Sequence, residues 1–304
     1  MRLLVGVDET EQSAAALRWA VALARDVQHA ALRRDGLTPP AVQLVVARAW
    51  MYPALPLMAN SGGTAEAEAM DAKILLSLRH FAERTLESTD PNALSMLEFV
   101  ALRGKATAAL IQYAEARHID LIVLGTRRLD AVERRFPGSV GRTITEQAPC
   151  DVAIVPLGSE SRRGPIVVGV DSSEDSRLLE SRAAQLAPAL SRDGVVLVHC
   201  SNYGSLVPSN AGLPISFAEI TGDLSSRVSK TLGNGLRAHG IHYRTVLTVG
   251  DPGRGLCNVA DNERARFLMV GTHTESTLKR MLFGGVGSYV TGHAHVPVMV
   301  VRKR

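Results

Sequence analysis

The sequence predicts an α/β protein made of two tandem doubly wound domains, each with a five-stranded parallel or mostly parallel sheet. Two observations predict it: apolar strand-like runs alternate with helical segments, and the same order of segments and motifs occurs in both halves. Continuous apolar runs such as 119–125 are typical of strands buried on both faces of a parallel sheet. Strands that alternate with helices imply right-handed crossovers, which place helices on both faces.

The duplication rests on matching motifs at both ends of each half. Val5-Gly6-Val7-Asp8 recurs as Val168-Gly169-Val170-Asp171, and a serine follows each aspartate by five residues, at Ser13 and Ser176. Gly138 follows Gly125 by 13 residues, and Gly284 follows Gly271 by 13. Matching features in the same order indicate an internal repeat.

The first half begins with a strand over residues 2–7, which are apolar apart from Arg2. Cap-type residues over 9–13 then precede a helix with apolar positions at helical spacing, and Gly36 with two prolines ends it. Prolines and glycines make 51–64 a loop. The expected strands of this half are 2–7, 42–49, 94–102, 119–125 and 152–157, and the expected helices are 14–34, 65–86, 106–117 and a short one from Ser139.

The second half repeats this order after a polar segment, 158–164, that ends before Pro165. At 304 residues the chain fits two domains of roughly 150 residues, a common domain size. The domains are therefore expected at 1–157 and 165–304. The expected strands here are 166–170, 195–200, 242–249, 267–272 and 296–301, and the expected helices are 175–191, from about 214 to 239, 254–262 and one near Val286.

Composition excludes several classes of function. The chain is 46% hydrophobic and 21% charged, and its net charge of +4 is not concentrated in a Lys/Arg run, so nucleic-acid binding is not indicated. Three scattered cysteines, Cys150, Cys200 and Cys257, fit a reducing compartment. With no signal-like segment and no apolar run of about 18 residues, we expect a cytoplasmic protein without a membrane span.

A ligand is expected at the carboxyl edge of each sheet, where the strand order reverses. If the first and fourth strands are neighbours, Asp8 and Gly125 flank that crevice in the first half, as Asp171 and Gly271 do in the second. Each aspartate could hold Mg²⁺ or bond a ribose; it could equally cap the following helix, since Asp is a favoured cap residue. Both alternatives stay open.

The turn at Gly138 and Ser139 begins a short helix. Small residues there leave backbone N–H groups accessible at the positive end of the helix dipole, which favours an anion. Together with the strand that ends at Gly125, this turn predicts a place to hold phosphates.

These motifs resemble the universal stress protein family over nearly the whole chain. The resemblance rests on Val-Gly-Val-Asp at each start, on 120–126, on Gly138-Ser139-Val140 and on 148–155. It implies two Rossmann-like adenine-nucleotide-binding repeats, with glycines and a serine around the phosphates. Carried over residue by residue, it implies a site in the first half at Gly6, Asp8, Ala49, Gly125, Thr126, Arg127, Arg128, Gly138, Ser139 and Val140, and in the second at Gly169, Asp171, Cys200, Gly271, Thr272, His273, Gly284 and Gly285.

The sequence departs from the family's Gly-x-x-Gly pattern in both halves. A further change, in the second half alone, makes the second site the weaker candidate for nucleotide binding. Arg128 and Thr274 stand where the second glycine of that pattern would be. A glycine there would let the backbone approach a phosphate closely, and a side chain narrows the site. Arg128 could instead reach back and neutralise phosphate charge. Gly285 replaces the serine of the first half, losing a hydroxyl but keeping the N–H.

The resemblance also implies cofactors and partners. ATP, with Mg²⁺ at Asp8 and Asp171, is the expected ligand, and no redox cofactor is expected. The family pairs through its last strands, which implies neighbouring edges at 152–157 and 296–302, and a homodimer. We expect a stress-response sensor or regulatory module that has no catalytic residues and at most weak ATPase activity. The alternatives are a scaffold that binds partner proteins without nucleotide, and a slow ATP hydrolase.

Overall fold

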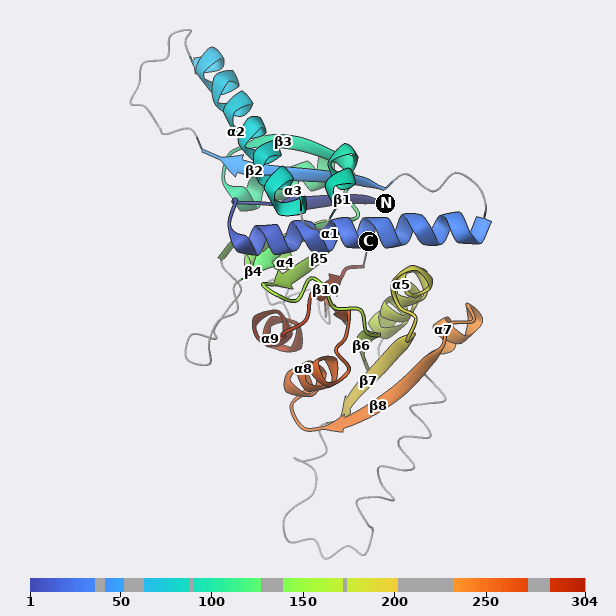
Figure 1. Cartoon of the computed structure of the whole chain (residues 1–304). Coiled ribbons are helices and arrows are strands. Elements are labelled where there is room, and N and C mark those ends of the chain that lie inside the picture. The colour runs from blue at the N-terminus through green and yellow to red at the C-terminus, as the bar shows by residue number, and fades with distance from the viewer. Residues whose placement is uncertain are drawn as a thin grey trace, which may run out of the picture. The chain divides into compact units, whose positions relative to one another are not determined.

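The computed structural model describes residues 1–35, 42–51, 63–87, 90–126, 139–171, 174–201, 232–272 and 285–303. These residues form two compact units, Met1–Glu160 and Ser161–Lys303. Each unit is a parallel sheet with helices packed against it (Figure 1). Among the described residues, no helix has the length and hydropathy needed to cross a membrane.

The first unit contains a five-stranded parallel sheet in the order β3-β2-β1-β4-β5. Its elements are β1 (Arg2–Gly6), α1 (Glu11–Asp35), β2 (Gln43–Trp50), α2 (Gly63–Leu86), β3 (Leu97–Arg103), α3 (Ala106–Ala116), β4 (Leu121–Thr126), α4 (Ser139–Gln147) and β5 (Asp151–Pro156). Helices α1 and α2 contact each other, as do α3 and α4. Because parallel crossovers are right-handed, these two pairs cover opposite faces of the sheet.

The start of β3 differs from the expected strand 94–102. Pro91–Met96 forms a short 3₁₀ helix, η1, and the strand begins only at Leu97. Proline favours the first turn of a helix because its φ is already near the helical value. Leu94 and Met96 are apolar, as strand residues often are, but they belong to η1. The prediction that the strand begins at residue 94 is therefore wrong.

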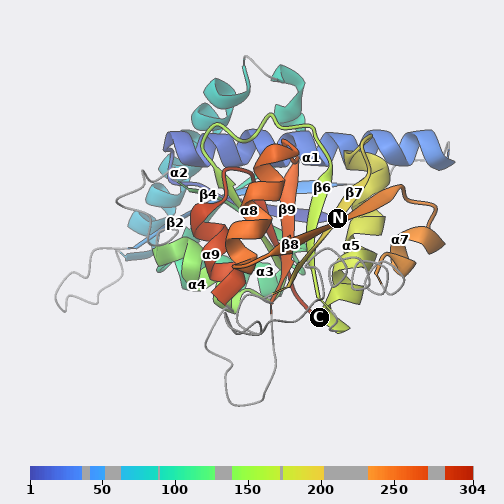
Figure 2. The same cartoon turned by 90° about the horizontal axis from the view of Figure 1, so that it is seen from below.

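The second unit repeats the topology, with the parallel order β10-β9-β6-β7-β8. Figure 2 shows α8 beside α9 and α5 beside α7, in agreement with their contacts. The elements are β6 (Ile166–Val170), α5 (Glu174–Leu190), β7 (Val195–Ser201), α7 (Asn234–Ala238), β8 (Tyr243–Val249), α8 (Pro252–Asn262), β9 (Phe267–Gly271), α9 (Gly285–His293) and β10 (Val298–Val301). The helix expected over 214–239 lies mostly outside the described residues, and α7 is its described part.

The two sheets have the expected reversal of strand order. Gly6 of β1 lies opposite Ala47 of β2 on one side and opposite Leu124 of β4 on the other. Likewise β6 lies between β7 and β9. The first and fourth strands of each half are therefore neighbours, as the predicted crevice requires. The fold class predicted from the sequence is confirmed.

The cores consist mainly of aliphatic side chains, because only 4% of the residues in the chain are aromatic. In the first unit, Leu4, Ile122 and Val152 face α3 and α4 and are fully buried. In the second, Val167, Leu268 and Val298 occupy the same places against α8 and α9. Continuous burial of the central strands explains why they read as unbroken apolar runs.

Candidate functional site

A cavity of about 630 Å³ lies at the carboxyl ends of β1, β2 and β4, beside the start of α4. It brings together every described residue that the sequence proposed for the first half: Gly6, Asp8, Ala49, Gly125, Thr126, Ser139 and Val140. Leu110 and Ile154 also line the cavity. The other three proposed residues, Arg127, Arg128 and Gly138, lie outside the described residues.

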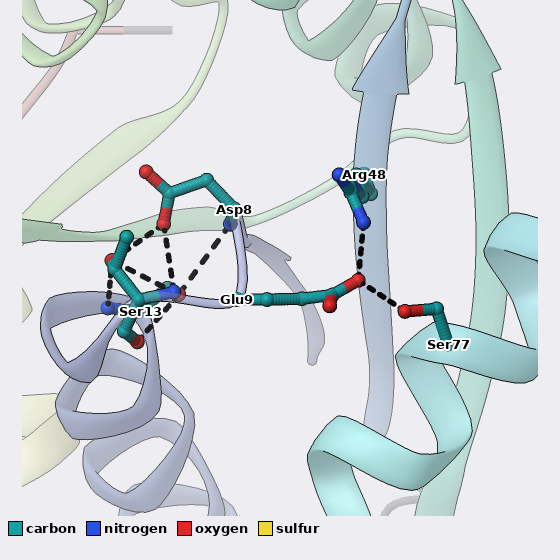
Figure 3. Close-up of polar contacts among 6 residues, drawn as sticks. Asp8, Glu9, Ser13, Arg48 and Ser77 are labelled. Atoms are coloured by element: carbon teal, nitrogen blue, oxygen red, sulfur yellow. Dashed lines mark hydrogen bonds and ion pairs between the residues drawn. The ribbon is translucent and has the colours of Figure 1, made fainter.

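Asp8 forms the turn between β1 and α1. Its Oδ1 accepts from the Thr10 hydroxyl at 2.6 Å and from the Thr10 backbone N–H at 3.3 Å. Figure 3 shows the other carboxylate oxygen directed away from this turn. One oxygen of Asp8 therefore acts as the helix-cap alternative predicts. Asp8 also lines the cavity, as the ligand-site alternative predicts.

The Asp8 carboxylate favours its ionised form. Burial raises its pKa, but hydrogen bonds from Thr10 and Ser13 outweigh that effect, and the net result is a pKa below the ordinary value. Hydrogen bonds to a carboxylate stabilise the charged state. The cavity therefore contains a negative charge at neutral pH.

Ser13 lines the cavity, although the sequence analysis did not assign it to the site. Its hydroxyl accepts from the Asp8 backbone N–H at 3.4 Å and donates to the Thr10 carbonyl at 3.0 Å. In the second unit, Ser176 accepts from the Asp171 N–H at 2.7 Å and donates to Asp171 Oδ1 at 2.7 Å. The five-residue spacing that repeats in both halves was the signal for this role.

At Gly125 the surrounding backbone leaves no room for a side chain, whereas at Gly6 a side chain would require neighbouring leucine side chains to shift. A Cβ at Gly125 would lie 2.0 Å from the Gln12 carbonyl oxygen, at the start of α1. A Cβ at Gly6 would lie 2.7 Å from the Leu124 side chain and 3.1 Å from that of Leu110. Gly125 lies within β4, opposite Val155, rather than in a turn after the strand. Both glycines allow close packing around the cavity.

The first turn of α4 also lines the cavity, with Ser139, Val140 and Gly141. The first N–H groups of a helix have no partner within the helix. The Thr145 hydroxyl donates to the Gly141 carbonyl at 2.7 Å, so this turn is braced from within the helix. An anion in the cavity would meet backbone donors at the positive end of α4.

Arg48 is a second residue of the cavity that the sequence analysis did not assign to the site. It follows Ala47 in β2, lines the cavity, and donates through Nη1 to Oε1 of Glu9. The same carboxylate oxygen accepts from the Ser77 hydroxyl of α2 at 2.7 Å (Figure 3). Position 48 is the one charged residue in the apolar run 42–49, which was a signal that could have been used.

A second hollow of about 390 Å³ adjoins the first and shares Ala49, Ala106, Ser139 and Val140 with it. It extends along the start of α3, at Lys105 and Thr107. The space beside the first cavity therefore continues outward between the starts of α3 and α4.

The second unit has a smaller cavity of about 270 Å³ in the corresponding place. Gly169, Asp171, Cys200, Gly271 and Gly285 line it. Thr272 follows β9 and is not among the described lining residues, and His273 and Gly284 lie outside the described residues. The cavity also contains Ser176, Pro252 and several aliphatic side chains, namely Leu179, Val198, Leu256, Val270 and Val286.

The second cavity has one backbone donor fewer than the first at the start of the third helix of its repeat. Pro252, which has no backbone N–H, begins α8 where Ala106 begins α3, and Asp251 caps α8 by accepting from the Arg254 N–H at 2.8 Å. Burial raises the pKa of the Cys200 thiol, although a hydrogen bond from Thr248 opposes this. Asp251 is thus the N-cap of α8, and Pro252 is its first residue.

Within the described part of the chain, no three His, Cys, Asp or Glu side chains are grouped to hold a metal ion. Asp8 and Asp171 each provide a single carboxylate to their cavity. Any Mg²⁺ held there would depend on ligand oxygens and water for most of its coordination, as Mg²⁺ at phosphate sites usually does.

The model of the Universal stress protein family matches this chain twice, over residues 1–156 and 163–302. The chain belongs to the universal stress protein family. The two matches agree with the internal repeat and with the two structural units.

Relatives match this chain from one end to the other. A universal stress protein of Mycobacterium tuberculosis is 27% identical over 306 residues, covering 99% of this chain and 97% of the relative. One from Mycobacterium bovis is 26% identical over 307 residues, covering 99% and 94%. This universal stress protein is therefore similar to others along almost its whole length.

Solved structures show the same fold. A universal stress protein from Archaeoglobus fulgidus superposes with a TM-score of 0.68 at 15% identity, covering 100% of this chain and 98% of that one. A putative universal stress protein from Pseudomonas aeruginosa gives a TM-score of 0.59 at 14% identity, covering 99% and 92%. At these identities the likeness concerns the fold alone.

Proposed function

We propose that the first repeat of this universal stress protein binds an adenine nucleotide, ATP in the first instance, as a sensor or regulatory module with little or no catalysis. The phosphates would lie at the start of α4 and the ribose beside Asp8. One observation carries the proposal: the seven described residues that the sequence proposed for this half converge on one cavity of about 630 Å³. That size lies within the range of ordinary small-molecule sites.

The chemistry of the lining supports this orientation of the nucleotide. The start of α4 offers backbone N–H groups and a positive helix end, which suit phosphate. Asp8 offers carboxylate oxygens to the hydroxyls of a ribose or to Mg²⁺. Two solved universal stress proteins, each aligned to about half of this chain, have cAMP and dAMP bound, respectively.

The second repeat is proposed as the weaker site. Its cavity is less than half the volume of the first, and Gly285 and Pro252 remove a hydroxyl and a backbone donor relative to Ser139 and Ala106. We expect one nucleotide per chain to bind with the higher affinity.

Calorimetry with ATP, with and without Mg²⁺, tests the proposal on three proteins. In Ser139→Asp a carboxylate is tolerated at the start of a helix but repels phosphate, so we expect at least about tenfold weaker binding. Gly285→Asp makes the matched change in the second repeat, where a Cβ meets no atom within 4 Å. It should leave the tighter site intact.

Three results would contradict the proposal. Absence of heat with the wild type would favour the scaffold alternative. Equal affinity of the wild type and Ser139→Asp would move the nucleotide away from α4. Rapid phosphate release that is lost in Asp8→Ala would make the protein a hydrolase.

The cellular setting is part of the same proposal. A cytoplasmic location is supported by three scattered cysteines, a pattern that fits a reducing compartment. Pairing of the two repeats through their last strands, and a homodimer, are supported by the family resemblance; sedimentation of the full chain tests the dimer.

A further inference from the structure

Helix α2 exposes apolar side chains along its first half. Between residues 65 and 76, the side chains of Ala67 and Ile74 are buried, whereas Leu76 is 57% exposed and Met70 is 40% exposed. Figure 1 shows this half of α2 extending away from the sheet of its unit. Apolar side chains that gather on one exposed surface commonly mark a place where another protein surface packs.

Four of the exposed apolar residues form a line along the helix, here called the α2 stripe. The stripe consists of Ala65, Ala69, Ala72 and Leu76, all of which are exposed. They follow one another at intervals of four, three and four residues, which is the spacing of the a and d positions of heptads. At about 100° per residue, the stripe lies on the opposite side of α2 from the buried Ile74. This half of the helix thus has one apolar face toward the core and another toward solvent.

The stripe is held in place by contacts on other sides of the helix. Asp71 Oδ1 accepts from the Trp50 indole N–H at 2.8 Å, and its Oδ2 accepts from Arg103 Nη2 at 2.6 Å. Trp50 ends β2 and Arg103 ends β3. Further along, the Ser77 hydroxyl donates to Glu9 Oε1 at 2.7 Å (Figure 3). Because the stripe is already fixed on the sheet, packing a partner against it costs little additional ordering.

The stripe is self-complementary when two copies of α2 run antiparallel. With a two-fold axis midway along the stripe, Leu76 of each copy would lie against Ala65 of the other, and Ala69 against Ala72. A large side chain opposite a small one fills the space between two helices, which a layer of facing alanines leaves open. Opposed helix dipoles also favour the antiparallel direction. A two-fold contact uses the same patch on both copies and closes as a dimer.

The charges beside the stripe fit this arrangement. Glu66 and Lys73 are exposed and directly follow Ala65 and Ala72, at the e positions of the heptads. In an antiparallel pair the e positions of the two helices face each other, so Glu66 of each copy would meet Lys73 of the other. In a parallel pair Lys73 would instead meet Glu68, at a g position. The two directions therefore depend on different glutamates.

We propose that the α2 stripe is a homodimer interface, at which α2 of a second copy of this chain packs antiparallel. This inference rests on the homodimer of the proposed function and names its surface, but it does not depend on nucleotide binding. The contact would extend over about three helical turns, which is small for an interface. The dimer should therefore be weak, with a dissociation constant on the order of 10–100 µM.

Sedimentation equilibrium of the full chain, from micromolar to submillimolar concentrations, tests the interface. The average mass of the wild type should rise from that of one chain toward that of two. Leu76→Lys should weaken dimerisation at least about tenfold, because each copy would then bring a charge against Ala65 of the other. Val249→Lys is the control, since Val249 is also an exposed aliphatic residue, 48% exposed, but belongs to β8. Circular dichroism checks that each variant keeps its helices.

A charge reversal tests the direction of packing. Glu66→Lys would bring lysines together and should weaken dimerisation about fivefold or more, whereas combining it with Lys73→Glu should restore the wild-type value. Residues 66 and 73 are about 10 Å apart along one helix, so recovery would report a contact between copies. Glu68→Lys is the matched control and should change dimerisation little.

Three results would overturn the proposal in different ways. A wild type that stays monomeric at every concentration would remove the interface and the homodimer together. A dimer that Leu76→Lys leaves intact would place the homodimer on another surface. Weakening by Glu68→Lys in place of Glu66→Lys would make the packing parallel. Calorimetry with ATP on the same samples measures nucleotide binding separately, so neither proposal can fail unnoticed behind the other.

Discussion

Gly125 and Gln12 approach so closely that a Cβ on Gly125 would lie 2.0 Å from the Gln12 carbonyl oxygen. The contact joins the end of β4 to the first turn of α1, and it brings Asp8, which precedes that turn, beside the cavity. The atom in the way is backbone, so a side chain at 125 could be accommodated only by moving the helix.

We therefore expect Gly125→Ala to lower the free energy of unfolding by about 2 kcal/mol or more, the cost of forcing atoms into a packed region. Urea denaturation followed by circular dichroism measures it. Gly285→Ala is the control, since a Cβ there meets no atom within 4 Å, and it should change stability by less than about 1 kcal/mol. Equal stability of Gly125→Ala and the wild type would mean that α1 moves aside at little cost.

The ionisation of Asp8 should depend on Thr10. Because the Thr10 hydroxyl donates to Oδ1 at 2.6 Å, Thr10→Val should raise the Asp8 pKa toward its ordinary value. An NMR titration of the side-chain carboxyl carbons measures this shift directly. Thr143→Val is the control, since the Thr143 hydroxyl donates to the Ser139 carbonyl rather than to a carboxylate.

The same shift fixes the sign of a pH dependence. A carboxyl with a lowered pKa in the folded state contributes stability above its unfolded pKa of about 3.9 and loses it as the pH falls through the folded pKa. The difference in stability between wild type and Asp8→Asn should therefore shrink below about pH 4. Asp8 is exposed, so the effect should be small. A difference that grows toward low pH would contradict the lowered pKa.

Cys257 should react with thiol reagents far more slowly in the folded protein than in the unfolded chain. Burial, with the charges of Asp261 and Asp251, raises its pKa to about 12. At pH 8 only about one thiol in 10,000 would be ionised, against roughly one in four for an ordinary cysteine, and the thiolate is the reactive form. Iodoacetamide labelling at pH 8 with peptide mass spectrometry, with and without urea, measures the two rates; similar rates would refute the raised pKa.

The sequence was sufficient to predict the internal repeat, the parallel sheet and the edge of the sheet at which the candidate site lies. Central strands buried on both faces must be apolar throughout, so they can be recognised without knowing their neighbours. The carboxyl ends of parallel strands share one edge of the sheet, so Asp8, Gly125 and Ser139 could be expected together. The early start given to β3 was wrong, because hydropathy does not separate Leu94 in η1 from Leu97 in the strand.

The roles of individual side chains needed the fold. Asp8 was equally compatible with a cap and with a ligand site, and only the positions of Thr10 and the cavity show one oxygen in the turn while the side chain lines the hollow. Arg48 could not be assigned from its own strand, because its partners Glu9 and Ser77 are 39 and 29 residues away in the chain.

The sequence by itself determined the duplicated α/β architecture and the edge of each sheet where a ligand would bind, because hydrophobic periodicity and motif spacing are local properties of the chain. Tertiary structure decided the unequal sizes of the two cavities, the packing reason for Gly125 and the orientation of Arg48. These depend on contacts between segments far apart in the sequence, and no local pattern specifies the distance between two such segments.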